Sequence, residues 1–292
     1  MKVEVKKIEQ NKRKLSIEVS ADIVSKKFDD IYAKIAKDAK IPGFRVGHAP
    51  RDILKKHYSS VAQEEVLKSL IPEIYDQAID AEKLEAVDLP QITDVKLDKN
   101  ILFFNATVEI KPEITLKDYK GIKINYQEIT VTPEQIKAKI DSLKESRKVA
   151  NIDDTLARSL GYPSVASLEK TLDAQIYLQK ENEQRIKIEQ AIIKHLLSGI
   201  DFNLPASLVE RQLKDMVSQA KVELALRGMS QDEVGKHADK LNEQLKPEAQ
   251  ERVKIYLILE AIAKKENIAL DEHMPSRVME FLLKEADWQK GG

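Results

Sequence analysis

The sequence contains no cysteine, a single tryptophan and only 5% aromatic residues among its 292 residues. The absence of thiols excludes disulfide frameworks, thiol nucleophiles and cysteine-based zinc sites, and it fits a reducing compartment. No stretch approaches the roughly 18 uncharged apolar residues that a membrane span requires, because the most apolar run, 255–263, contains Glu260. The first residues alternate apolar and polar side chains without the apolar core of a signal peptide. We therefore expect a cytoplasmic protein that does not cross a membrane.

The common catalytic signatures are also missing. The sequence has no Walker A motif, no G-x-G-x-x-G, no H-E-x-x-H and no G-x-S-x-G. Its carboxylates recur beside lysines at helical spacing, where surface ion pairing accounts for them. The five histidines lie far apart, without the spacing of metal ligands: His48, His57, His195, His237 and His273. We expect no enzyme, no metal and no cofactor.

Charge is abundant but unevenly distributed. Lysine and arginine number 48 and aspartate and glutamate 49, whereas residues 1–60 alone carry a net charge of +7. A basic segment of this kind can hold the phosphates of a nucleic acid or an acidic protein face, with an attraction that salt weakens. The more common interpretation of such a segment is a solvated lysine surface. Charge alone leaves both interpretations open.

Residues 1–112 show the pattern of a small α+β domain. Apolar and polar residues alternate in four segments, whereas spacings of three and four between apolar residues indicate helices. Pro50 is placed to begin a short helix, Ser60 and Gln63 form a capping box for the next one, and Pro72 predicts a kink in it. The expected strands are 2–9, 13–20, 91–97 and 101–110, and the expected helices are 22–40, a short one after Pro50, and one from Ser60 past Ala78.

The remainder of the chain is predicted to be helical. Residues 113–152 are expected to form an extended linker and one helix, begun by the capping box Thr132–Gln135, and residues 153–292 an elongated all-α domain. Residues 164–198 form one long helical pattern whose middle has a single apolar residue, which predicts an arm projecting into solvent. Further helix starts are expected at Pro205, Ser230, Pro247 and Asp271.

Two glycines and two prolines interrupt the helical patterns at Pro42–Pro50. Gly43 and Gly47 permit positive φ on either side of Phe44-Arg45-Val46, so the tripeptide is expected at a loop tip. A phenylalanine contributes about 1.5–3 kcal/mol when a partner buries it, and arginine offers a planar fork for a carboxylate or phosphate. The alternative is an ordinary helix connection whose Phe44 packs inward.

One apolar stripe follows Pro205 at helical spacing. Such a stripe is usually core, yet a helical domain with few neighbours can use it as an adaptable binding surface, to which flexible methionine is suited. The candidate binding residues on this stripe are Val209, Leu213, Met216, Val217 and Leu224.

The segment Pro42–Pro50 resembles the ribosome-binding signature G-F-R-x-G-x-x-P of the bacterial trigger factor family, in the matching β-β-α-loop-α context. The resemblance continues through Lys111–Leu116, Leu156–Tyr162 and Ile200–Pro205. It implies an ATP-independent chaperone that docks at the exit tunnel of the large ribosomal subunit, against protein and RNA, and shelters nascent or unfolded polypeptides. The apolar stripe after Pro205 then becomes the candidate client-binding surface. It implies neither a membrane nor a DNA partner. The residues that it assigns to ribosome binding are Gly43, Phe44, Arg45, Val46, Gly47, His48 and Pro50.

The chain departs from the family pattern in two respects. Full-length members carry a prolyl isomerase domain of the FK506-binding type after the helix at 133–148, whereas here Lys148–Asp153 leads directly into the helical domain. We therefore expect no isomerase activity. His48 stands where many members carry lysine, which predicts weaker or more pH-sensitive docking. The alternative function is a ribosome-independent assembly scaffold that reuses the fold.

Overall fold

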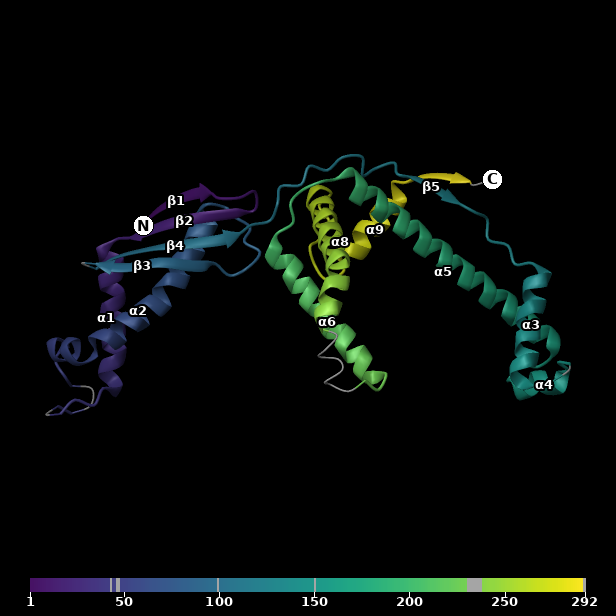
Figure 1. Cartoon of the computed structure of the whole chain (residues 1–292), viewed down its shortest axis with the longest axis horizontal. Coiled ribbons are helices and arrows are strands. Elements are labelled where there is room, and N and C mark those ends of the chain that lie inside the picture. Colours follow the sequence, from purple (N-terminus) through teal and green to yellow (C-terminus); the bar gives the residue numbers. More distant parts are fainter. Residues whose placement is uncertain (43, 46–47, 99, 150, 230–237, 291–292) are drawn as a thin grey trace. The chain divides into compact units, whose positions relative to one another are not determined.

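A computed structural model describes residues 1–42, 44–45, 48–98, 100–149, 151–229 and 238–290. Contacts divide the chain into two compact units, of which the first combines Met1–Glu113 with Phe202–Val253 and the second combines Ile114–Asp201 with Lys254–Gly292. An antiparallel sheet with helices is followed by a mostly helical region (Figure 1), which confirms the predicted fold class. The domain boundaries expected from the sequence, 1–112, 113–152 and 153–292, remain a prediction.

The first unit is built on a four-stranded sheet in the order β1-β2-β4-β3, with every neighbouring pair antiparallel. Its strands are β1 (Lys2–Lys7), β2 (Lys12–Val19), β3 (Gln91–Asp98) and β4 (Ile101–Glu109). Alternate residues of the two central strands are buried, because successive side chains point to opposite faces of a sheet. The inward set comprises Leu15, Ile17, Val19, Leu102, Phe104, Ala106 and Val108.

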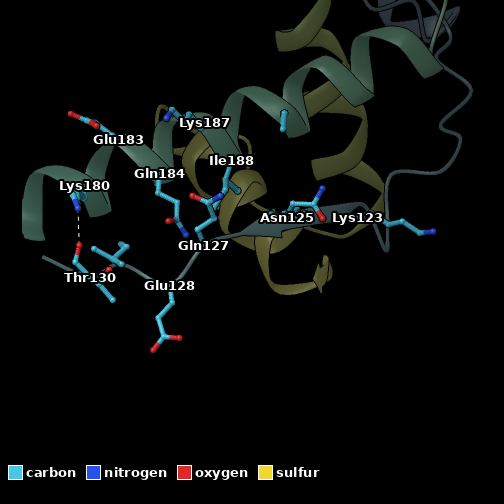
Figure 2. A pocket seen from close by; sticks show the side chains of 13 residues that line it. Lys123, Asn125, Gln127, Glu128, Thr130, Lys180, Glu183, Gln184, Lys187 and Ile188 are labelled. Atoms are coloured by element: carbon cyan, nitrogen blue, oxygen red, sulfur yellow. Dashed lines mark hydrogen bonds between the residues drawn. The ribbon is translucent and has the colours of Figure 1, made fainter. Parts of the chain in front are cut away.

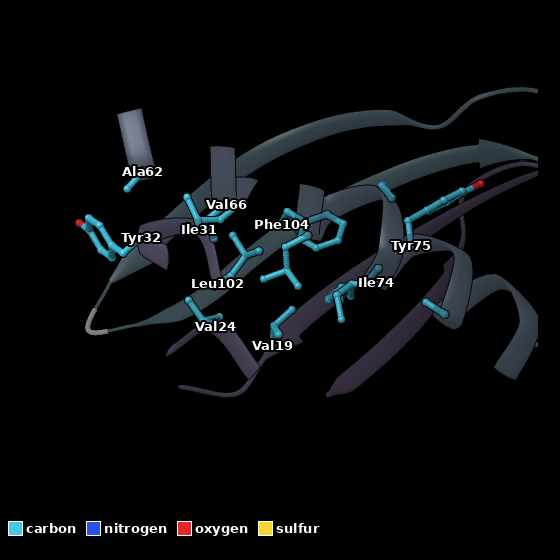
Figure 3. Close-up of a cluster of buried hydrophobic side chains, with 14 of the residues drawn as sticks. Val19, Val24, Ile31, Tyr32, Ala62, Val66, Ile74, Tyr75, Leu102 and Phe104 are labelled. Atoms are coloured by element: carbon cyan, nitrogen blue, oxygen red, sulfur yellow. The ribbon is translucent and has the colours of Figure 1, made fainter. Parts of the chain in front are cut away.

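Two helices share one hydrophobic cluster with this inward face (Figure 3). They are α1 (Ala21–Asp38) and α2 (Arg51–Ala81). Helix α2 is kinked at Tyr58, whose dihedrals are non-helical, so that two helical segments meet there, in agreement with the short helix predicted after Pro50 and the helix start predicted near Ser60. Pro72 lies inside the second segment, where the dihedrals remain helical. Burial of one continuous row from Ala62 to Ala78 on the cluster stabilises this segment more than Pro72 interrupts it.

Helix α6 (Ala206–Leu226) is capped by a residue of the sheet. Its N-cap is Pro205, which offers no side-chain acceptor. The Glu109 carboxylate instead accepts hydrogen bonds from the Ser207 N–H at 2.9 Å and the Ser207 hydroxyl at 2.6 Å. A negative carboxylate at a helix N-terminus is favourable because it meets unpaired N–H groups and the positive end of the helix dipole. Asn11 also donates through its side-chain amide to the carbonyl of Asn203.

Substitution of Glu109 by alanine is expected to loosen the first turn of α6. Loss of a capping acceptor costs about 1 kcal/mol, so amide exchange at Ser207 and its neighbours should accelerate about fivefold. Hydrogen exchange resolved by residue measures this. Glu18→Ala is the matched control, since Glu18 is an exposed strand carboxylate without a hydrogen-bond or ion-pair partner in the described part of the chain. Equal acceleration in both variants would contradict the assignment.

The second unit contains β5 (Lys123–Tyr126), α3 (Pro133–Arg147), α4 (Asp154–Ser159), α5 (Val165–Gly199), α9 (Met274–Lys284) and β6 (Asp287–Lys290). Helix α8 (Ala238–Lys265) contributes to both units. Three predicted helix starts are present: the capping box of Thr132 with Gln135, Ser164 accepting from the Ser167 N–H at 3.3 Å, and Pro205 before α6. Helix α4 begins at a cap that the sequence analysis did not predict, Asp153, which accepts from the Leu156 N–H at 2.8 Å. The helix start expected at Ser230 lies outside the described residues. Pro247 does not open a helix but lies within α8, which corrects that prediction.

The segment predicted as a linker after residue 113 is built into the second unit. Strand β5 pairs in parallel with β6, a strand that the sequence pattern did not predict. The Tyr119 hydroxyl donates to Glu266 at 2.6 Å, and the Lys120 ammonium lies 2.8 Å from the same carboxylate. Hydrogen bonds from Lys120 and Tyr119 hold the pKa of Glu266 below its usual value. These contacts tie the segment after residue 113 to β6 and to Glu266, the residue that follows α8.

The long helix α5 is buried near its two ends and exposed in its middle. Leu168 and Leu172 are buried in the first third, and Ile188, Ile192 and Leu196 in the last. Between them Leu178 is 61% exposed, in agreement with the polar middle of the pattern. This middle nevertheless has a neighbour, since the Lys180 ammonium donates to the Thr130 carbonyl at 2.7 Å.

Candidate functional site

The candidate loop joins α1 to α2 and is anchored in the core at both ends. Helix α1 ends at Asp38, and the next residues include Ala39 and Ile41, which are buried in the hydrophobic cluster. On the far side, the extended Pro50 precedes α2, and Leu54 returns to the same cluster. A loop fixed at both ends presents its intervening residues in a restricted range of positions, which lowers the entropy cost of binding a partner.

The aromatic ring of Phe44 lies at the surface, with 40% of the residue exposed. Arg45, His48 and Pro50 are exposed as well. Two hydrogen bonds shape the loop: the Phe44 N–H donates to the Ile41 carbonyl at 3.1 Å, and the His48 N–H donates to the Arg45 carbonyl at 3.0 Å. The alternative interpretation required Phe44 to pack inward, and its exposure contradicts that interpretation. Gly43, Val46 and Gly47 lie outside the described residues.

The loop is surrounded by exposed positive charge. Lys37 and Lys40 at the end of α1, and Lys55 and Lys56 in the first turns of α2, are exposed and have no ion-pair partner among the described residues. The guanidinium of Arg45 likewise has no partner in the described part of the chain. An unpaired guanidinium beside a half-exposed aromatic ring suits a partner that offers a carboxylate or phosphate next to an apolar pocket.

The predicted client stripe on α6 is mostly packed. Val209 is 8% exposed and Met216 and Val217 are 6% exposed, whereas Leu213 and Leu224 are half-buried. Burial of three of the five residues supports the alternative that the sequence left open, in which the stripe is core. Whether the stripe also binds clients stays a prediction.

Sequence reasoning missed a second apolar pair on α6. Val222 is 61% exposed and Leu226 is 83% exposed, and their spacing of four places them on one face near the end of the helix. The helical spacing in the sequence already indicated this pair, because Val222 and Leu226 lie on a different face of the helix from Met216 and Val217. Exposed apolar side chains at adjacent positions mark candidate contact surfaces.

Neither a metal cluster nor a membrane span is found among the residues that the structure describes. No three histidine, aspartate or glutamate side chains in those ranges converge in an arrangement that could hold a metal ion. Likewise, no helix within them has both the length and the apolar character that crossing a lipid bilayer demands. The contact chemistry available at the loop is therefore that of Phe44, Arg45 and the surrounding lysines.

Comparison with known families accounts for both halves of the chain. The family model described as "Bacterial trigger factor protein (TF)" matches residues 1–143, and "Bacterial trigger factor protein (TF) C-terminus" matches residues 164–287. The chain belongs to the bacterial trigger factor family. The trigger factor segment matched by the first model contains the Phe44–Arg45 loop.

Individual trigger factors are similar along nearly the whole chain. The protein named "Trigger factor" from Halothermothrix orenii is 24% identical over 385 aligned positions, which cover 96% of this chain and 90% of the relative. The trigger factor of Natranaerobius thermophilus is 38% identical over 141 positions, which cover 48% of this chain and 32% of the relative. The 385-position alignment exceeds the 292 residues of this chain, so the relative carries internal residues that have no counterpart here.

A solved structure shares the fold. It is described as "Promiscuous Substrate Recognition in Folding and Assembly Activities of the Trigger Factor Chaperone". The TM-score is 0.55 at 16% sequence identity, over 96% of this chain and 93% of the other. The likeness extends through both the sheet-containing and the helical parts of the trigger factor fold.

Proposed function

We propose that this protein is an ATP-independent chaperone of the bacterial cytoplasm that docks at the exit tunnel of the large ribosomal subunit and shields nascent or unfolded chains. The observation that carries the proposal is the exposed Phe44–Arg45 pair, presented on a loop pinned at both ends within a trigger factor N-terminal domain. The remaining loop residues assigned by the resemblance, Gly43, Val46, Gly47, His48 and Pro50, belong to the same docking segment.

The proposed docking contact is transient and electrostatically assisted. Burial of Phe44 contributes about 1.5–3 kcal/mol, far below the roughly 8 kcal/mol that micromolar affinity requires. Arg45 and the unpaired lysines Lys37, Lys40, Lys55 and Lys56 supply the remainder by attraction to acidic protein or RNA phosphate. Affinity should therefore fall steeply with added salt, and release after each round of synthesis remains rapid.

Client shielding in this proposal uses exposed apolar side chains. The exposed pair Val222 and Leu226 is a stronger candidate than the buried residues Val209, Met216 and Val217. Leu213 and Leu224, which are half-buried, lie on the predicted stripe of the same helix and remain candidates. Holding an unfolded chain on such residues needs only apolar contact and mass action, so no nucleotide is required.

The proposal excludes prolyl isomerase activity. Helix α3 ends at Arg147, its C-cap Lys148 adopts φ 56° and ψ 41°, and Asp153 already caps α4. Only residues 149–152 separate the two caps. A folded domain needs at least about 40–50 residues, so none is inserted at the position where the family resemblance places the isomerase.

No acceleration of prolyl cis/trans isomerisation is expected in a short peptide assay. The uncatalysed reaction takes tens to hundreds of seconds at 25 °C, so weak catalysis would be visible. A chymotrypsin-coupled assay or exchange NMR on a Xaa-Pro peptide measures the rate, with an FK506-binding protein as the positive control. A rate that rises in proportion to protein concentration would contradict this part of the proposal.

The function as a whole is tested by two measurements on the full chain. Co-sedimentation with ribosomes over a salt series should show binding at low salt that declines as salt rises, whereas the assembly-scaffold alternative predicts no ribosome binding at any salt concentration. Dilution of a denatured client should show less aggregation in the presence of equimolar protein, with or without ATP. Absence of both effects would reject the proposal.

A further inference from the structure

A groove in the second unit lies between α5 and the chain segment that begins with β5 (Figure 2). Its volume is about 550 Å³. Ile124 of β5 and Ile188 of α5 line it and are 2% and 8% exposed, so they form an apolar floor. Amide side chains of Asn125, Gln127 and Gln184 also line the groove, where they can donate and accept hydrogen bonds.

One edge of β5 has no strand beside it. Among the described residues, β5 is hydrogen-bonded to β6 alone, and it packs against α5. The chain then continues through 127–131, for which no backbone-to-backbone hydrogen bond is found in the described ranges. The Lys180 ammonium fixes the far end of this segment by donating to the Thr130 carbonyl at 2.7 Å. A strand edge with unpaired N–H and C=O groups is a template for an added extended chain.

The groove carries more positive than negative charge, since three lysines and two glutamates line it. Glu128 forms an ion pair with Lys290 at 2.7 Å and points away from the groove in Figure 2, and Glu183 keeps its charge while it accepts a hydrogen bond from the neutral Gln179 amide at 2.9 Å. In contrast, Lys123 and Lys187, which flank the groove on β5 and α5, have no partner in the part of the chain that the structure describes. The groove is therefore complementary to an anionic occupant.

We propose that this groove binds an extended acidic peptide, which adds as a strand along β5, places an apolar side chain over Ile124 and Ile188, and sets carboxylates beside Lys123 and Lys187. The site goes beyond the proposed chaperone function, because it needs neither a ribosome nor an unfolded client. The occupant is a peptide with alternating apolar and acidic residues, since alternate side chains of a strand face the same way.

The only tryptophan of the sequence provides a reporter for this site. Trp288 pairs with Ile124 across the β5–β6 ladder, and its ring centroid lies 5.9 Å from that of Tyr126. The residue is 45% exposed, so a peptide along β5 should shift its emission. The probe is an acetylated, amidated octapeptide that alternates valine with aspartate and lacks tryptophan and tyrosine. Anisotropy of the same peptide carrying fluorescein gives an independent readout.

Saturable binding of the acidic octapeptide is expected by both readouts. Replacement of its aspartates by asparagine should weaken binding about threefold to tenfold, and replacement by lysine should weaken it further. N-methylation of single peptide nitrogens should abolish binding at alternate positions only, because only every second N–H of an added strand faces the edge. Equal affinities for all three charge variants, or no saturation by about 1 mM peptide, would overturn the proposal.

Two pairs of matched variants locate the site. Lys187→Gln should weaken the acidic peptide about threefold without affecting the asparagine peptide, whereas Lys194→Gln, an exposed lysine of α5 outside the groove, should change neither. Ala191→Phe fills the groove and should abolish binding, while Ala174→Phe, exposed elsewhere on α5, should not. All four positions are exposed, so melting temperatures should hold. Undiminished binding to Ala191→Phe would refute the assignment, whatever the result for ribosomes or aggregating clients.

Discussion

Replacing Phe44 and Arg45 together by alanine is expected to abolish co-sedimentation with ribosomes while leaving the thermal melt of the protein unchanged. Phe44 is exposed and lies outside the hydrophobic cluster, so its truncation removes no core contact. Both side chains instead supply the largest contacts that the loop offers a partner, an aromatic anchor and a bidentate fork. The lysines around the loop remain in the double variant but cannot by themselves give a specific contact.

The effect of each side chain can be separated. Arg45→Lys keeps the charge and loses the planar fork, so binding should fall to an intermediate level. The matched control is Ile101→Ala with Lys96→Ala, an exposed apolar residue and an exposed cation on the β3–β4 hairpin, and it should bind like the unmodified protein. Binding retained by the loop variant would refute the docking assignment. A lowered melting temperature would show that Phe44 supports the fold.

The second large effect is expected from paired substitutions on α6. Met216→Ser with Val217→Ser truncates two buried side chains, and truncation of one buried Leu, Ile or Met alone costs about 2–5 kcal/mol of unfolding free energy. The two introduced serine hydroxyls would also be buried without an assured hydrogen-bond partner. A large drop in the urea midpoint is therefore expected, without a specific loss of aggregation suppression per folded molecule.

The exposed pair on the same helix should behave in the opposite way. Val222→Ser with Leu226→Ser removes apolar surface that already faces solvent, so the melting temperature should hold. Suppression of client aggregation, measured by light scattering at equal folded concentration, should decrease. If suppression instead follows Met216 and Val217, the stripe predicted from the sequence is the client surface after all.

The local elements of this protein were readable from its sequence because their signals are local. Alternation placed the four strands of the sheet, and the capping box at Thr132 and the side-chain cap at Ser164 placed the starts of α3 and α5. The docking loop was also readable, since two glycines and two prolines between helical patterns can form no regular element. The short connection between residues 148 and 153 was also readable, because it lies between two strong helix signals.

What the sequence could not show depends on contacts between residues far apart in the chain. Helix α2 continues past Pro72 because its buried row packs in the hydrophobic cluster, and α8 passes through Pro247. Residues Asp287–Lys290 form a strand only because β5 lies beside them. The sequence by itself determined the order of the elements and the composition of the loop. Only the tertiary structure decided that Phe44 faces solvent, that Met216 does not, and that β5 has an open edge, since exposure is set by the neighbours that folding brings together.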